Sequence, residues 1–125
     1  YLMTKSKIQI YKNKKKVTLK KMFGICLEQH HNFEKKFQVY KDFRDKGYIV
    51  NPGIKFGCDF AVYEKGPGID HAPFLVQVYN KNENMTSTDI VLAGRLATSV
   101  KKQFILAIPT GKEKVEYLAL DWWKA

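Results

Sequence analysis

The sequence predicts a mixed α+β (α/β) protein, and three observations lead to that class. Apolar residues recur at helical spacing in three segments, and short alternating or continuous apolar runs lie between and after them. With 125 residues, 45% of them hydrophobic, the chain is long enough to bury one ordinary core. We expect a small basic lead-in over residues 1–45, followed by a body with a mixed sheet over residues 46–125.

The lead-in begins with two short predicted strands, at 8–11 and 17–19, joined by the basic loop 12–16. Thr18 is a good N-cap for a helix that ends before His30. Four aromatic residues then recur at intervals of three and four, which predicts a second helix over 33–46. Asn32 is its expected cap and Gly47 its expected stop.

The body begins with three short predicted strands at 48–50, 59–63 and 73–79, with a Gly-Pro-Gly turn at 66–68 between the last two. A helix capped by Thr88 or Asp89 follows and should end near Lys102. The run 104–108 is typical of a buried central strand, and a last strand is predicted at 114–120.

The charge of the chain favours anionic partners, nucleic acid above all. The net charge is +10, and eight lysines but no acid lie within residues 1–22. This basic segment is either a phosphate-binding face or a solvated hairpin that keeps a small protein soluble. Cys26 and Cys58 have no metal-ligand or disulfide spacing. No apolar run is long enough for a membrane span and no signal pattern opens the chain, so we expect a soluble, cytoplasmic protein.

Four residues of the body are candidates for chemistry. If the strands around the 64–70 turn pair, Tyr63 and His71 flank one end of the sheet and form a candidate acid/base pair. Arg95 and Lys102 are seven residues apart, so on a helix they project about 20° from one another along one face. Each residue also has an ordinary structural interpretation: a packing tyrosine, a surface histidine, and cations at a helix end.

Several motifs in order resemble the tRNA-splicing endonuclease family. They are Gly-Tyr-Ile-Val from Gly47, Gly-Ile-Lys-Phe-Gly-Cys-Asp-Phe-Ala-Val-Tyr ending at Tyr63, Asp-His-Ala around His71, and Ala-Gly-Arg-Leu-Ala-Thr-Ser-Val-Lys-Lys ending at Lys102. The resemblance covers about residues 40–122. It implies a restriction-endonuclease-like mixed-sheet catalytic domain and maps the catalytic Tyr, His and Lys of the family onto Tyr63, His71 and Lys102.

The resemblance implies cleavage of precursor tRNA at intron–exon junctions within a bulge-helix-bulge, without metal or cofactor, leaving 2′,3′-cyclic phosphate and 5′-hydroxyl ends. Such an attack needs a group that takes the 2′-hydroxyl proton, an acid for the departing 5′-oxygen, and a cation for the charge on phosphorus. Tyr63, His71 and Lys102 would fill these roles in that order. A free phenol has a pKa of about 10, so Tyr63 either gains help from a cation or only orients the hydroxyl.

The resemblance also assigns RNA-binding residues. Arg95 and Trp122 correspond to the two side chains that grip an extruded bulge base in the family, and Lys101 lies where the family usually carries Arg. Trp122 could instead pack in the core, because Trp123 is its neighbour and one of the two side chains must face inward. Stacking between a guanidinium and an indole would stabilise a flipped base by about 1–3 kcal/mol.

One loop departs from the family pattern. Homo-oligomeric relatives carry an acidic loop between the last two strands, but here residues 109–114 contain more base than acid. We therefore expect a hetero-oligomer with a homologous structural subunit that supplies the acidic loop.

Two other functions compete with this one. A metal-dependent nuclease would need, after Asp59, an acid and a lysine on the next strand, where Gln77-Val78-Tyr79 stands. A non-catalytic RNA-binding subunit would not need Tyr63, His71 and Lys102 together.

The expected location depends on the source. We expect a cytoplasmic protein, or a nuclear one if the source is eukaryotic.

Overall fold

The computed structural model describes residues 1–69 and 74–120, and the chain divides into two compact units, Tyr1–Glu34 and Lys35–Ala125. That division lies earlier in the chain than the boundary after residue 45 that the sequence suggested. The physical reason is the helix α2 (Phe33–Asp45), because its residues Val39 and Phe43 are buried against the sheet of the second unit.

The first unit contains a small hairpin followed by a helix. β1 (Ile10–Lys12) and β2 (Lys15–Val17) pair antiparallel, and the two residues between them, Asn13 and Lys14, both have positive φ, as a type I′ turn requires. The Thr18 hydroxyl accepts a hydrogen bond from the Lys21 N–H and caps α1 (Leu19–Gln29). A hairpin, the Thr18 cap and the helix that ends before His30 are thus confirmed, but the predicted strand bounds are wrong: the loop is only two residues long, and most of the segment 12–16 belongs to the strands.

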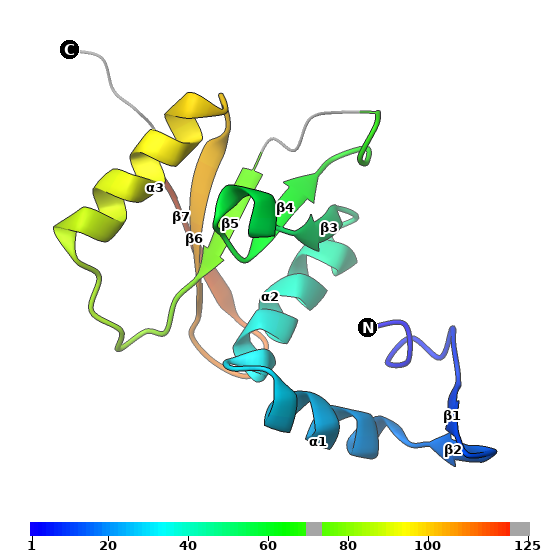
Figure 1. The fold of residues 1–125 in the computed structure, drawn as a ribbon. Coiled ribbons are helices and arrows are strands. Elements are labelled where there is room, and N and C mark those ends of the chain that lie inside the picture. The colour runs from blue at the N-terminus through cyan, green and yellow to red at the C-terminus, as the bar shows by residue number, and fades with distance from the viewer. Residues whose placement is uncertain (70–73, 121–125) are drawn as a thin grey trace. The chain divides into compact units, whose positions relative to one another are not determined.

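The second unit is a five-stranded sheet in the order β3-β4-β5-β6-β7, with helices on both of its faces (Figure 1). β5 and β6 are parallel, and the other pairs are antiparallel, which confirms the predicted mixed sheet. The strands are β3 (Ile49–Pro52), β4 (Phe60–Tyr63), β5 (Phe74–Val78), β6 (Gln103–Pro109) and β7 (Val115–Leu120).

The two faces of the sheet form two separate apolar clusters. On one face, Val62 and Val76 pack with Val39 and Phe43 of α2. On the other face, Leu75, Phe104 and Leu106 pack with Ala93 and Ala97 of α3 (Ser87–Ser99). Because successive strand residues alternate between faces, this assignment tells which side of the sheet each functional side chain occupies.

The start of α3 differs from the expectation that Thr88 or Asp89 caps it. Thr86 is the N-cap: its hydroxyl accepts from the Asp89 N–H at 3.2 Å, and the Asp89 carboxylate accepts from the Thr86 N–H at 2.9 Å. The Thr86 hydroxyl also donates to the Asp89 carboxylate at 2.7 Å, and this bond and then the bond from the Thr86 N–H lower the pKa of Asp89. Within the described ranges, the helices are all too short or too polar to cross a membrane.

Candidate active site

Tyr63 is the last residue of β4. It pairs with Ile49 of β3, and its neighbour Val62 pairs with Phe74 at the start of β5. The side chain is half-buried against the cluster on the α3 face, which contains Leu75. The phenol therefore lies at the end of the sheet where β4 finishes and β5 begins, as the sequence predicts.

Lys102 lies between the end of α3 and the start of β6. Lys101 adopts the left-handed conformation, with φ 52°, and donates its N–H to the Thr98 carbonyl. The Lys102 N–H donates to the Ala97 carbonyl at 2.9 Å. These two bonds form a Schellman motif, which ends the helix and turns the chain into the sheet.

This ending corrects the expectation that Arg95 and Lys102 share one helical face. The helix stops at Ser99, so Lys102 has left its axis, and the angle and spacing of an ideal helix do not apply. Arg95 remains on α3, where its side chain is exposed, and Lys101 is also exposed.

Tyr63 ends β4 and Lys102 comes just before β6, and β5 lies between these two strands. Tyr63 follows Val62, which pairs with Phe74, and Lys102 precedes Gln103, which pairs with the same Phe74. Two strand spacings separate the two residues, or about 10 Å between their backbones. Tyr63 packs with the cluster on the α3 face, and so does Phe56, whose ring the Lys102 ammonium contacts.

The Lys102 ammonium lies 5.7 Å from the centre of the Phe56 ring, within cation–π distance. Phe56 ends the short 3-10 turn η1 (Ile54–Phe56) and packs against the α3-face cluster. Gly53 makes this turn possible, since a Cβ there would come within 2.6 Å of the Cys58 carbonyl oxygen. Sequence reasoning used the Lys-Phe-Gly motif only for the resemblance and missed this contact, which depends on tertiary structure.

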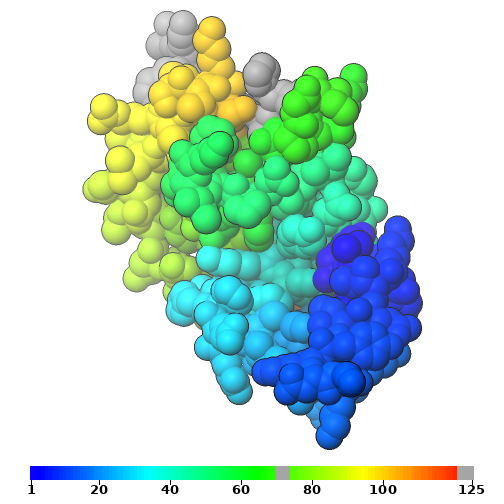
Figure 2. All heavy atoms as spheres, turned by 45° about the vertical axis from the view of Figure 1, so that its right-hand side comes forward, coloured from blue at the N-terminus to red at the C-terminus, as the bar shows by residue number. Residues whose placement is uncertain are grey.

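Figure 2 shows where these elements reach the surface of the second unit. The green surface of residues 54–57 borders the yellow surface of α3, in agreement with the pocket that Gly57 and Leu96 both line. The turn, the end of α3 and the start of β6 therefore form one continuous region.

His71 and Trp122 lie outside the described residues, as do their neighbours 70–73 and 121–125. The described residues nearest to them in the sequence are Ile69 and Phe74 for His71, and Leu120 for Trp122. Leu120 pairs with Phe104, and Phe74 pairs with Gln103, so both are at the end of the sheet that carries Tyr63 and Lys102.

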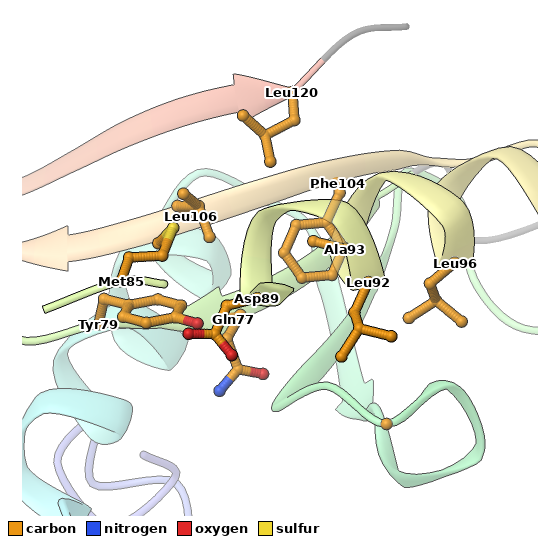
Figure 3. Close-up of a pocket in the computed structure, with 11 residues that line it drawn as sticks. Gln77, Tyr79, Met85, Asp89, Leu92, Ala93, Leu96, Phe104, Leu106 and Leu120 are labelled. Carbon is orange, nitrogen blue, oxygen red and sulfur yellow. The ribbon is translucent and has the colours of Figure 1, made fainter. Parts of the chain in front are cut away.

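A pocket of about 280 Å³ lies between α3 and the sheet (Figure 3). Most of the residues that line it are apolar, and its polar side chains are Gln77, Tyr79 and Asp89. Burial and then the Asp89 carboxylate raise the pKa of Tyr79. Neither Tyr63 nor Lys102 lines the pocket, which therefore lies beside the candidate site and is separate from it.

Asp59, the residue that a metal-dependent nuclease would use, is engaged in structural contacts. Its carboxylate lies 2.6 Å from the Lys36 ammonium and accepts the Val78 N–H at 2.9 Å. The side chain is only 10% exposed. Asp59 thereby ties α2, β4 and β5 together, and the neighbouring strand offers Gln77 and Tyr79 in place of a second acid.

Comparison with known proteins identifies the family of this chain. Residues 33–117 match the model of the tRNA intron endonuclease, catalytic C-terminal domain. The chain is 50% identical over 93 residues to a tRNA-splicing endonuclease of Hyperthermus butylicus, which covers 74% of this chain and 51% of that protein. It is 39% identical over 125 residues to that of Sulfurisphaera tokodaii and 41% identical over 126 residues to that of Pyrobaculum islandicum, covering 99% of this chain and 69% of each relative. The resemblance found in the sequence motifs is thus confirmed: the chain belongs to the tRNA intron endonuclease family, a family of endoribonucleases.

Proposed function

We propose that this chain cleaves precursor tRNA at intron–exon junctions, within a bulge-helix-bulge, by a metal-independent attack of a ribose 2′-hydroxyl on the adjacent phosphorus. The products are a 2′,3′-cyclic phosphate and a 5′-hydroxyl. The observation that supports this best is that Tyr63 and Lys102 lie at the same end of the sheet and on the α3 face, where β4 finishes and β6 begins. His71 belongs to the connection between those two strands.

Each residue of the trio has a defined part in this reaction. Tyr63 takes or orients the proton of the 2′-hydroxyl while its oxygen forms the new bond to phosphorus. His71 gives a proton to the 5′-oxygen as its bond to phosphorus breaks. Lys102 stabilises the negative charge that builds on the phosphoryl oxygens. The cation–π contact with Phe56 restrains the Lys102 ammonium, so less motion has to be lost when RNA binds.

Three further residues are proposed to hold the RNA. Arg95 and Trp122 would stack on either side of an extruded bulge base, and Lys101 would contact a phosphate. The exposure of Arg95 and Lys101 is consistent with these roles.

The proposed quaternary state is a hetero-oligomer with a homologous structural subunit that supplies an acidic loop. The corresponding loop of this chain, residues 109–114, carries Lys112 and Lys114 against one acid. Gln38 of α2 donates to the carbonyl oxygens of Gly111 and Lys114, which fixes the backbone of this loop. Native mass of the protein alone and with its partner tests the proposal, and a fully active homotetramer would refute it. The relatives named above come from archaea, so we propose a cytoplasmic location.

The decisive test is the chemistry of the cleaved ends. A bulge-helix-bulge transcript is incubated with the protein and its partner in EDTA, and the 3′ ends are analysed. We expect a 2′,3′-cyclic phosphate, which a metal-dependent nuclease would not leave and a non-catalytic subunit would not make. His71→Ala should slow single-turnover cleavage about a hundredfold or more, while His31→Ala, the matched control in the first unit, should cleave like the wild type. Wild-type cleavage by His71→Ala would remove His71 from the mechanism.

A further inference from the structure

The β1–β2 hairpin presents an unbroken basic surface. All six residues from Tyr11 to Lys16 are exposed, and they include four lysines. We call this segment, residues 11–16, the basic ribbon. Its base is anchored by Val17, which is only 5% exposed. The lysines are therefore held on a folded support.

Like charges lie next to one another in the basic ribbon. Lys12 and Lys15 are directly opposite one another, where like charges destabilise a hairpin. No acid occurs before Glu28 in the sequence. Among the residues that the structure describes, none forms an ion pair with these lysines.

The start of α1, which follows the hairpin directly, adds to this charge (Figure 1). Its first turn contains Lys20 and Lys21 and no acid. Cations are unfavourable at the positive end of a helix dipole. Positive charges repel one another in the hairpin, and the lysines of the first turn of α1 are repelled by the positive end of the helix dipole. A bound anion would reduce both repulsions.

The remaining side chains of the basic ribbon indicate which anion fits. Tyr11 is 59% exposed and pairs across the hairpin with Lys16, so a ring and an ammonium share one face. An aromatic ring beside cations can stack on a base or a ribose next to a bound phosphate. The tip, Asn13 and Lys14, has no apolar residue that could enter a membrane.

We propose that the basic ribbon is a second RNA-binding site, which holds the phosphate backbone of the precursor tRNA apart from the scissile phosphodiester. The proposal rests on the proposed function for the identity of the RNA. None of its residues is a catalytic candidate, because all of them belong to the first unit. Its contribution should therefore appear in affinity and salt dependence and not in the rate of the chemical step.

The test removes Lys12, Lys15 and Lys16 together by substitution with Gln and keeps the Asn13-Lys14 turn. Binding of a precursor-tRNA transcript is measured from about 50 to 300 mM salt in EDTA, and single-turnover cleavage is measured at saturating RNA. We expect the affinity at about 100 mM salt to fall at least about tenfold and the slope of log K against log salt to fall by about 2–3. The saturating cleavage rate should stay at the wild-type value.

Two matched variants complete the design. Substituting the same three lysines with Arg retains the charge and should retain affinity, which separates loss of charge from loss of fold. Lys81→Gln removes one charge from the second unit and should weaken binding less than Lys15→Gln does. Unchanged affinity and salt slope in the triple Gln variant, with the cleavage rate intact, would overturn this inference and leave the proposed function standing. Absence of wild-type cleavage would instead refute the proposed function, and the binding data would still decide the role of the basic ribbon.

Discussion

Tyr63, the last residue of β4, and Lys102, the residue just before β6, are each the chain neighbour of a residue that pairs with Phe74. The pairing of Val62 with Phe74 is antiparallel and that of Phe74 with Gln103 is parallel, so the end of β4 and the start of β6 lie at the same end of the sheet. Two strand spacings, or roughly 10 Å, separate their backbones. Tyr63 packs on the α3 face, and the Lys102 ammonium contacts Phe56 of the same cluster.

Tyr63→Phe and Lys102→Ala are each expected to lower the single-turnover cleavage rate by about 10²–10³-fold, with RNA affinity nearly unchanged. Each variant removes a group that acts on the reacting atoms and leaves the sheet intact. The double variant should lose much less than the product of the two effects, because residues that act as a unit are not additive. Tyr79→Phe is the matched control, since Tyr79 lies on the same face but lines the separate pocket. Wild-type cleavage by Tyr63→Phe would show that its hydroxyl has no part in the chemistry.

Lys101 allows its backbone role to be separated from a role in RNA binding. Its φ of 52° is the left-handed conformation that glycine adopts without strain. Lys101→Gly should keep the fold and the saturating cleavage rate while lowering RNA affinity. Lys101→Val should cost about 1–2 kcal/mol of stability and slow cleavage, because a β-branched residue resists this conformation and Lys102 would shift. Denaturant unfolding and single-turnover kinetics check both. Equal cleavage rates for Lys101→Gly and Lys101→Val would show that the backbone conformation of Lys101 does not position Lys102.

Arg95 and Trp122 should matter most for substrates that contain a bulge. Arg95→Ala and Trp122→Ala are each expected to weaken binding of a bulged RNA by about 1–3 kcal/mol, because a stacking partner of the extruded base is lost. An unbulged duplex of the same length should bind each variant like the wild type. Val91→Ala is the control on α3, where Val91 is also exposed. Equal losses on both RNAs for Trp122→Ala would mean that Trp122 packs in the core.

The order of helices and strands follows from local patterns, and the structure confirms it. The alternation of apolar residues predicts strands, and their helical spacing predicts helices, because an element that buries one face needs apolar residues on that face. The end of α3 was predicted wrongly because the sequence has no glycine after Ser99 to mark a Schellman motif, and Lys101 takes the glycine position. Thr86 and Asp89 have the spacing of a capping box in the sequence, but Thr88 and Asp89 are also good caps, and the reciprocal bonds with Asp89 identify Thr86 as the N-cap.

The candidate site is less accessible to sequence reasoning than the fold. That Tyr63 and Lys102 lie at the same end of the sheet depends on the register of β4, β5 and β6, which joins residues far apart in the chain. The contact of Lys102 with Phe56 joins residues far apart in the chain, so spacing could not reveal it. The positions of His71 and Trp122 in the site stay predictions, because both residues lie outside the described ranges.

Asp59 is expected to be a structural carboxylate. Asp59→Ala should lower the free energy of unfolding by about 2–3 kcal/mol, because it leaves the Lys36 ammonium and the Val78 N–H without their partner. Lys36→Met should cost less, since its side chain is 39% exposed and such pairs contribute about 1 kcal/mol or less. Denaturant unfolding measures both. At a temperature where Asp59→Ala is folded, its cleavage rate in EDTA should match that of the wild type. If cleavage by Asp59→Ala were lost in EDTA and restored as the Mg²⁺ concentration is raised, Asp59 would instead be a metal ligand.

Tyr117 should make stability depend on pH in the alkaline range. Its hydroxyl donates to the Asp42 carboxylate, and burial followed by this hydrogen bond raises the pKa of Tyr117. A group with a raised pKa in the folded state contributes stability that is fully present below its unfolded pKa, about 10 for tyrosine, and is lost as pH rises toward the folded value. Tyr117→Phe should therefore be about 1–2 kcal/mol less stable than the wild type at pH 8. That difference should shrink steadily above about pH 10, as measured by urea unfolding. Tyr11→Phe is the control, because Tyr11 is exposed in the first unit and its loss should cost little at either pH. A stability difference for Tyr117→Phe that stays constant from pH 8 to 11 would show that the hydroxyl is not held protonated by the carboxylate.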